Sequence, residues 1–338
     1  MNISIRSTKV LSLLGLLAIG ILLTVEHSKF YQRQDHHDEK IRAAQLAQRA
    51  MQQIKAHYFP NEIALDNIND PNQTGMIGQQ FSAITSGRGS LPIKLSTTNP
   101  NFAAMVVQQI KAAGLQKGDH VGLCFTGSFP ALNIATYAAL EVLELNPILI
   151  ASVSSSSWGA NSPDLTWLDM HQHLYQEGLF STLPVAASIG GNQDLGRTLS
   201  KAGRQLALKA IERNSLPVIN EGSLEKNIQK RMVIFNQHAQ QPIRLMINVG
   251  GGVASLGGHQ NASSLPAGLS TQMTIDQFKE KRGILYEMTR RGVPIINLLR
   301  INQLMAKYDL PRDPVPLPAI GEGALFIAYQ YNLKIVIG

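Results

Sequence analysis

The chain has 338 residues, of which 44% are hydrophobic and 16% charged, with a formal net charge of +7 at pH 7 and one cysteine, Cys124. These values exclude a disordered chain and an internal disulfide, and the length allows one large α/β domain or two smaller ones. Because basic residues are interleaved with acids, the charge predicts either solvated helix faces or a broad positive field that attracts an acidic polymer or anionic lipid.

A run without charged residues, 10–25, follows the basic residues Arg6 and Lys9 near the N-terminus. A membrane span usually needs about 20 apolar residues, so this run is short for a span and also fits the apolar region of a signal peptide. No small-x-small cleavage site follows it, so residues 1–25 are predicted to be a cytoplasmic tip and an uncleaved transmembrane signal anchor. Positive charge on the short N-terminal side predicts a single-pass protein of the cytoplasmic (inner) membrane whose globular part is extracytoplasmic.

Residues 26–90 are predicted to form a helical stalk and a loop-rich connector. Apolar residues recur at helical spacing over 26–59, between charged and glutamine residues, which indicates an amphipathic helix. This helix either leaves the membrane as a stalk or packs on the globular domain as its first helix. Residues 61–90 are rich in Asn, Asp, Gly, Ser and Thr, a composition typical of loops.

Residues 91–338 alternate between helical and strand patterns. A buried strand over 121–125 is followed by a helix from Pro130 and a second buried strand over 147–153. This alternation predicts an α/β fold with a mainly parallel sheet flanked by helices in Rossmann-like layers, with a division into two lobes near 180–190 as an alternative. Further strands are expected over 183–189, 216–219, 244–249 and 293–297, and one or two over 324–337.

Two glycine-containing turns follow predicted strands. Thr126-Gly127-Ser128 ends the first strand and precedes the helix at Pro130, and Gly250-Gly251-Gly252 follows Asn248 at the end of a later strand. Ligands in parallel α/β sheets bind beyond the carboxyl ends of the strands, and free N–H groups at helix N-termini attract anions or carbonyl oxygens. The two turns therefore predict a binding cleft. Neither turn matches the dinucleotide fingerprint, and no phosphate-loop motif occurs, so no ATP or NAD cofactor is expected.

Ser128 is the sharpest candidate nucleophile. A serine on a strand-to-helix turn resembles a nucleophile elbow, although the second glycine of that motif is missing here. The alternative is that Ser128 caps the helix or binds a ligand oxygen without reacting.

The segment 162–174 contains Asp164, Asp169, His171 and His173, which could supply a base. On a helix, Asp169 and His173 share a face, which suits a metal pair, an acid–base couple or a surface hydrogen bond. Asp164 could cap the helix. Because no third ligand can be assigned, no metal site is predicted.

Other polar residues near glycines or strand ends are candidates for ligand binding. In the turn 192–197, Asp194 either caps a helix or binds ligand, and Arg197 either grips a carboxylate or is solvated. Glu322, between two glycines, is a candidate site acid or a turn residue. Ser157 and Asn161 belong to a polar segment that follows the strand 147–153.

Several motifs together resemble those of the poly-gamma-glutamate system proteins, a bacterial family with a single membrane anchor. They are Thr-Gly-Ser-Phe-Pro-Ala-Leu-Asn at 126–133, Ser-Trp-Gly-Ala-Asn at 157–161, Thr-Trp-Leu-Asp at 166–169, Asn-Val-Gly-Gly-Gly at 248–252 and Pro-Leu-Pro-Ala-Ile-Gly-Glu-Gly at 316–323. The resemblance extends over most of the chain from residue 97 and implies a role in making or exporting the gamma-linked glutamate polymer, beside other subunits of that system. It carries over no catalytic residues.

Three functions follow as hypotheses. The leading one is a membrane-anchored accessory component of poly-gamma-glutamate synthesis or export that binds the acidic glutamyl polymer or partner subunits. The alternative is an extracytoplasmic amide-bond hydrolase or transferase that acts on this polymer, with Ser128 as nucleophile and His171 or His173 as base. A third is a purely structural subunit. No nucleic-acid partner is expected, because the chain has no helix-turn-helix or stacking-aromatic pattern.

Overall fold

The computed structural model describes residues 8–60 and 65–331. A seven-stranded sheet in the order β11-β12-β10-β3-β4-β8-β9 forms the centre of its α/β domain. Neighbouring strands pair in parallel, except that β11 is antiparallel to β12. The predicted class, a mainly parallel sheet flanked by helices, is confirmed. The strands are β3 (His120–Thr126), β4 (Asn146–Ser152), β8 (Ala186–Ser188), β9 (Val218–Ile219), β10 (Ile243–Val249), β11 (Gly268–Ser270) and β12 (Ile295–Leu298).

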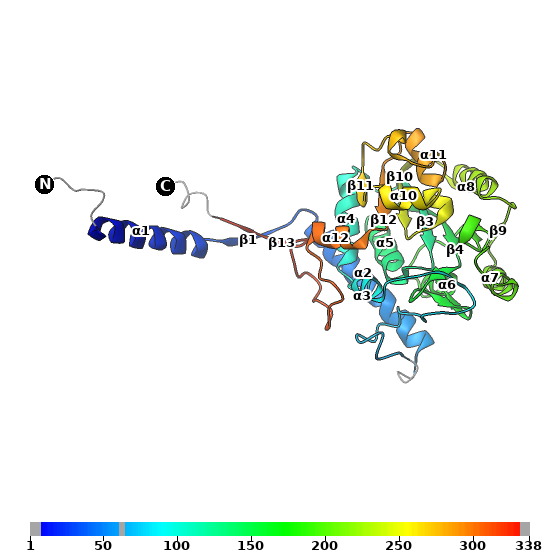
Figure 1. Ribbon diagram of the computed structural model, residues 1–338, viewed down its shortest axis with the longest axis horizontal. Coiled ribbons are helices and arrows are strands. Elements are labelled where there is room, and N and C mark those ends of the chain that lie inside the picture. Colours follow the sequence, from blue (N-terminus) through cyan, green and yellow to red (C-terminus); the bar gives the residue numbers. More distant parts are fainter. Residues whose placement is uncertain (1–7, 61–64, 332–338) are drawn as a thin grey trace.

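Helices cover both faces of this sheet (Figure 1). Val121, Leu123 and Phe125 of β3 pack with α4 and α5 in one hydrophobic cluster. Cys124 of the same strand packs with α8 and α11 in a second cluster, and burial raises the pKa of its thiol to about 11. The helices are α3 (Leu91–Thr97), α4 (Phe102–Ala112), α5 (Pro130–Val142), α6 (Trp167–Gln176), α7 (Lys201–Arg213), α8 (Leu224–His238), α9 (Val253–Leu256), α10 (His259–Ser264), α11 (Ile284–Arg290) and α12 (Ile301–Tyr308).

The order of the strands creates a switch point in the middle of the sheet. The chain starts at β3, adds β4, β8 and β9 on one side, and then returns to place β10 on the other side of β3. Connections from β3 and β10 therefore leave the sheet in opposite directions, which opens a crevice at the carboxyl ends of these two strands. The same sheet continues through β8, so residues on both sides of 180–190 contribute to one sheet.

Short elements beyond the main sheet complete the edge where these strands end. Strand β2 (Thr85–Gly87) pairs in parallel with β5 (Ser155–Ser156). A small hairpin joins β6 (Asn161–Ser162) to β7 (Leu165–Thr166). Two 3-10 helices, η2 (Asn192–Asp194) and η3 (Ile275–Gln277), lie in the connections. The β2–β5 pair links a segment before β3 to the segment after β4.

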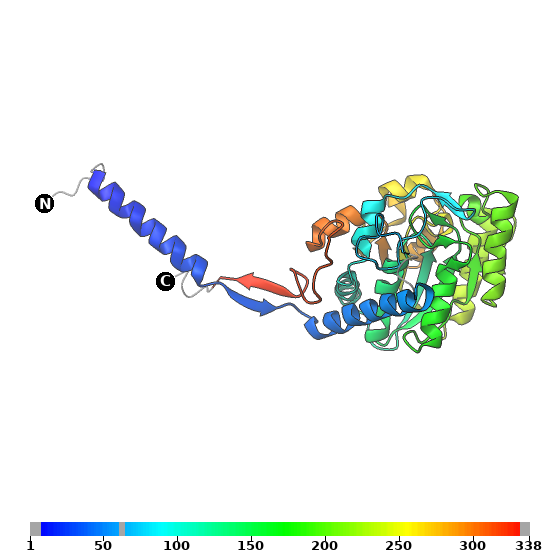
Figure 2. The same cartoon turned by 90° about the horizontal axis from the view of Figure 1, so that it is seen from below.

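Helix α1 (Thr8–His27) is apolar, and its residues Val10–His27 have a mean hydropathy of 2.0 with none of them buried. It is long and apolar enough to cross a membrane by length and composition. Figures 1 and 2 show α1 projecting away from the α/β domain, to which it is joined by a two-stranded ribbon. In this ribbon β1 (Phe30–Arg33) pairs antiparallel with β13 (Ile327–Gln330).

Helix α2 (His37–Tyr58) lies on the domain against α4 and α5. Its apolar side chains, such as Met51 and Ile54, are buried. Lys40 Nζ donates to Leu325 O at 2.8 Å, and burial lowers the pKa of this lysine. The helix expected over residues 26–59 was either a stalk or the first helix of the globular domain. The structure shows that it packs on the domain as its first helix. It begins at His37 because residues 30–33 pair with β13 instead.

The final expected strand is shorter than the pattern over 324–337 indicated. Strand β13 covers Ile327–Gln330, and residues 332–338 lie outside the described part of the chain. Arg6, one of the basic residues from which the orientation of the anchor was predicted, also lies outside the described residues.

Candidate functional site

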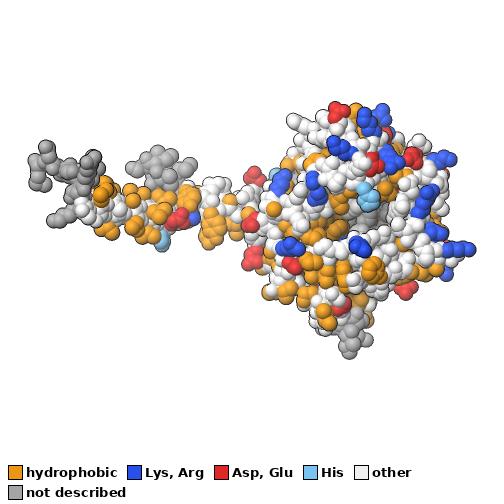
Figure 3. All heavy atoms as spheres, viewed as in Figure 1, with side chains coloured by type: hydrophobic (Ala, Val, Ile, Leu, Met, Phe, Trp, Pro, Cys, Tyr) orange, Lys and Arg blue, Asp and Glu red, His pale blue; other side chains and the backbone are white. Residues whose placement is uncertain are grey.

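A cavity of about 760 Å³ lies at the carboxyl ends of the central strands. Its wall includes the strand ends Thr126 of β3 and Ser152 of β4, and the glycines Gly251 and Gly252 after β10. Figure 3 shows a hollow on this face of the domain, with lysine and arginine side chains around it. The crevice that the strand order creates is thus an open site.

The two glycine turns expected to form a cleft lie against each other. A Cβ on Gly250 would lie 2.5 Å from Thr126 Oγ1, and its φ of +88° is one that side-chain-bearing residues rarely adopt. Asn248 is buried and holds this turn, because its Nδ2 donates to Gly250 O and to Asn297 Oδ1, both at 2.9 Å. Asn248 and Gly250 therefore shape the site, while Gly251 and Gly252 face the cavity.

The turn after β3 is fixed by the segment that follows β4. Gly127 O accepts from the Ala160 N–H at 2.8 Å, and Ser128 Oγ accepts from the Ser156 N–H at 3.1 Å. Ser157 donates its N–H to Gly87 O at 2.9 Å. Ser128 lines the cavity, and the backbone bond of Ser157 anchors the loop that carries Ser156 beside it.

Lys94 is a functional candidate that the sequence reasoning missed. It lies on α3, is 2% exposed, and lines the cavity with its Nζ 2.8 Å from Ser156 Oγ. Nζ also donates to Ser128 O and lies 3.8 Å from the centre of the Phe129 ring. Burial lowers the pKa of Lys94 to about 7. The sequence contained a signal for this residue, because Lys94 is the one charged residue in the otherwise uncharged stretch 91–110.

Asp194 also lines the cavity, in an ion pair with Arg231. Both side chains are 2% exposed, and Arg231 Nη2 lies 3.0 Å from Asp194 Oδ2. Ser188 Oγ donates to Asp194 Oδ1 at 2.7 Å, and Asn227 Nδ2 donates to Oδ2 at 3.1 Å. The carboxylate is therefore held from several sides, and it stabilises the floor of the cavity.

The structure does not bring Ser128 together with the expected base. His171 is fully buried on α6, where its Nε2 lies 2.8 Å from Thr182 O and its ring contacts Trp167 and Phe180. Burial lowers the pKa of His171 to about 4. Among the residues described, those that line the cavity with Ser128 do not include His171.

Asp169 and His173 have partners of their own. Asp169 completes a capping box with Thr166 and accepts from Arg213 Nε at 2.7 Å, which helps lower its pKa against the effect of burial. His173 stacks on His57 with ring centres 4.0 Å apart. Within residues 8–60 and 65–331, no group of three His, Cys, Asp or Glu side chains could hold a metal ion.

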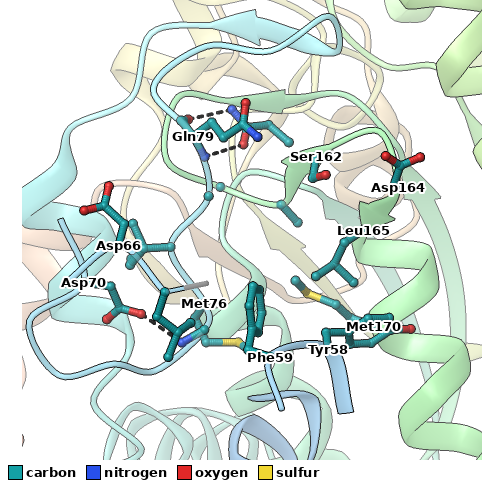
Figure 4. A pocket seen from close by; sticks show the side chains of 17 residues that line it. Tyr58, Phe59, Asp66, Asp70, Met76, Gln79, Ser162, Asp164, Leu165 and Met170 are labelled. Carbon is teal, nitrogen blue, oxygen red and sulfur yellow. Dashed lines mark hydrogen bonds between the residues drawn. The ribbon is translucent and has the colours of Figure 1, made fainter. Parts of the chain in front are cut away.

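The remaining candidates lie outside the cavity lining. Arg197 is exposed, and Glu322 Oε2 accepts from the Ala319 N–H at 2.8 Å, as a turn residue would. Asn161 and Asp164 line a second cavity of about 420 Å³, where Asn161 Nδ2 donates to Gln79 O at 2.7 Å. Figure 4 shows Asp164 and Asp66 on opposite sides of this second cavity.

The main cavity carries an excess of positive charge. Its two acids are both paired with arginines, Asp194 with Arg231 and Glu280 with Arg282, whose Nη2 lies 2.9 Å from Glu280 Oε2. Lys94 and Arg88 also line the cavity, and neither has a carboxylate within ion-pair distance in the described part of the chain. An anionic ligand would therefore meet Arg88, a cation that no carboxylate of the described residues neutralises.

Comparison of this chain with protein-family models, with curated proteins and with solved structures found no match.

Proposed function

We propose that this protein is a membrane-anchored accessory component of poly-gamma-glutamate synthesis or export and that its main cavity binds the glutamyl polymer. The charge of the cavity carries this proposal, because both of its acids are paired while Arg88 stands exposed without a carboxylate partner among the described residues. A guanidinium group binds carboxylates through two parallel hydrogen bonds. The glutamyl polymer supplies one carboxylate in every repeat.

The sequence motifs support the same ligand. Two segments that resemble the poly-gamma-glutamate system proteins, 126–133 and 248–252, meet at this cavity, where Gly250 lies against Thr126. The cavity lies at the switch point of the sheet, the place where Rossmann-like folds bind their ligands. Its floor is rich in hydroxyl groups, which suit the amide groups of a polymer backbone.

Helix α1 is proposed to be an uncleaved, single-pass anchor in the cytoplasmic membrane. None of its described side chains is buried and its leucines and isoleucines are exposed, which is costly in water and favourable in lipid. The basic residues before it predict an extracytoplasmic α/β domain, beside the other subunits that make or export the polymer. Retention in alkaline-washed membranes and digestion of the domain by protease added to spheroplasts would support this arrangement, whereas release of a shortened soluble chain would contradict it.

Binding is tested with the full-length protein in lipid nanodiscs and purified poly-gamma-glutamate. Replacement of Arg88 in R88Q removes the exposed cation of the cavity, and we expect about 5-fold weaker binding, the size of an exposed charge contact. Added salt weakens binding of the wild type. The control R197Q removes an exposed arginine outside the cavity lining and keeps the wild-type affinity.

Two results would refute binding of the polymer through its carboxylates. One is the absence of binding to the wild type, and the other is equal binding of the methyl-esterified polymer, which has the same backbone without the charges. A loss of affinity in R197Q that equals the loss in R88Q would place the polymer outside the cavity.

A further inference from the structure

A lysine and a serine from distant parts of the chain meet in the wall of the main cavity. Lys94 comes from α3 and Ser156 from β5, and Lys94 Nζ lies 2.8 Å from Ser156 Oγ. Ser156 is partly exposed to the cavity, so a ligand can reach its hydroxyl group. A hydroxyl group in contact with a base is the arrangement that activates serine as a nucleophile.

The surroundings of Lys94 favour its neutral form. The side chain is 2% exposed and has no carboxylate within ion-pair distance in the described residues. Loss of hydration holds its pKa at about 7, so a large fraction of the amine is uncharged at neutral pH. A neutral amine can donate one N–H to Ser128 O and still direct its lone pair at Ser156.

Ser128 positions both members of this pair. Its carbonyl oxygen accepts from Lys94 Nζ, and its Oγ accepts from the Ser156 N–H at 3.1 Å. The loop before α3 also approaches closely, because a Cβ on Gly89 would lie 2.3 Å from Ser157 O and 3.1 Å from Lys94 Cε. The lysine and the serine are thus held in contact by backbone atoms on two sides.

A further hydroxyl group of the same cavity lacks a partner. Ser154 is 3% exposed, lines the cavity, and its Oγ makes no hydrogen bond in the described structure. Buried polar groups are nearly always hydrogen-bonded, so this unpartnered hydroxyl group is unusual for the wall of a cavity. The cavity, at about 760 Å³, has room for a substrate of several residues.

We propose that Ser156 is the nucleophile and Lys94 the general base of an acyl-transfer site that acts on amide or ester carbonyl groups. Lys94 Nζ takes the Ser156 hydroxyl proton as Oγ bonds to the carbonyl carbon, and the C=O electron pair moves to oxygen. When the pair returns, the bond to the leaving amine or alcohol breaks, and Lys94 gives its proton to that group. Water then attacks the ester with Lys94 again as base, which frees the acid and restores the Ser156 hydroxyl.

This site extends the proposed function without depending on it. Polymer binding through Arg88 concerns the charge of the cavity, whereas the reaction needs only a carbonyl group within reach of Ser156. The matching test therefore uses a probe that has no glutamate.

The probe is a fluorophosphonate, whose phosphorus bonds to an activated serine oxygen with loss of fluoride. Full-length protein in nanodiscs is incubated with the probe, and labelled peptides are identified by mass spectrometry. We expect one label, on Ser156, and none in S156A. S263A removes an exposed serine outside the cavity lining and is labelled at the wild-type rate. S128A removes one hydrogen bond to the Ser156 N–H and slows labelling by about 5-fold.

The role of Lys94 is tested by its titration. The labelling rate of the wild type rises with pH through a midpoint near 7 as the amine loses its proton. K94R keeps a cation that cannot act as a base, and K94M keeps the length without charge. Both lose labelling by about 100-fold and lack the midpoint. Tryptophan fluorescence of each variant reports whether it is folded. If a variant does not fold, the pH profile of wild-type labelling still tests the role of Lys94.

Three outcomes would overturn the proposal: labelling of Ser128 or Ser154 in place of Ser156, labelling of the wild type that does not change with pH between about 5 and 9, and a folded wild type that the probe does not label. Polymer binding measured on the same sample separates these outcomes from a failure of the proposed function.

Discussion

Replacement of Arg231 by methionine tests whether the buried ion pair supports the floor of the cavity. Arg231 Nη2 lies 3.1 Å and 3.0 Å from the two carboxylate oxygens of Asp194 and 2.6 Å from Ser188 Oγ. In R231M the Asp194 carboxylate stays buried without its cation. Removal of one partner of a buried pair costs about 3–5 kcal/mol. Since Ser188 and Asn227 still donate to Asp194, we expect about 3 kcal/mol.

The loss is measured by urea unfolding of the full-length protein in detergent micelles, followed by tryptophan fluorescence. Trp158 and Trp167 are the two tryptophans of the chain, and both lie in the α/β domain, so the signal does not report on α1. The control R290M breaks an exposed pair in which Arg290 Nη1 lies 3.3 Å from Glu287 Oε2, and it changes stability by less than about 0.5 kcal/mol.

The double variant D194N/R231M separates the ion pair from packing. It removes both charges, so its loss of unfolding free energy is smaller than the sum of the two single losses. A loss in R231M within about 1 kcal/mol of the control, or strict additivity in the double variant, would refute the reasoning.

Two further predictions concern the turn after β10 and the buried histidine. G250A combines a φ of +88° with a Cβ 2.5 Å from Thr126 Oγ1, so we expect it to lose about 2–4 kcal/mol of unfolding free energy and to bind the polymer more weakly. The control G114A, with a φ of +77° and open space around its Cβ, loses only about 1 kcal/mol. Equal losses in the two variants would contradict the close approach of Gly250 to Thr126. His171 has its pKa lowered from 6.5 to about 4 by burial, so the unfolded chain takes up a proton below pH 6.5 that the folded one does not. The contribution of neutral His171 to stability is complete above pH 6.5 and is lost as pH falls toward 4, which lowers the unfolding free energy in urea by about 3 kcal/mol. H171F should remove that part of the pH dependence. An unchanged pH dependence of stability in H171F would exclude His171 as its source.

The sequence predicted the parts of the fold that depend on local pattern. Strand β3, the helix after it and strand β10 each have a continuous apolar pattern bounded by glycine or proline, and the structure has them within a few residues of the expected bounds. The start of α2 was not predictable from its own pattern, because residues 30–33 pair with β13 near the other end of the chain. A local pattern contains no information about such a partner.

The candidate site also divides into residues that a local pattern predicted and residues that depend on contacts between distant segments. Thr126 and the glycines after Asn248 were predicted from turn chemistry, since the carboxyl ends of parallel strands share an edge. The contact between Lys94 and Ser156 joins two segments 62 positions apart, and neither segment has a recognisable motif. His171, or His173 as its alternative, was expected to act as a base because both lie in a cluster of Asp and His residues in the sequence. Its neighbours in space are the rings of Trp167, Tyr137 and Phe180.

The ribbon of β1 and β13 has a consequence for how the cavity is supplied. Its strands are four residues long, and a strand rises about 3.4 Å per residue, so the ribbon spans only about 14 Å. If α1 lies in a membrane, a paired spacer of this length keeps the domain close to the bilayer and restricts its rotation. A polymer leaving a neighbouring membrane subunit would then meet the cavity at an effective concentration in the millimolar range. At that concentration the cavity needs only modest affinity to bind the polymer. A weakly bound polymer can also dissociate from the cavity quickly.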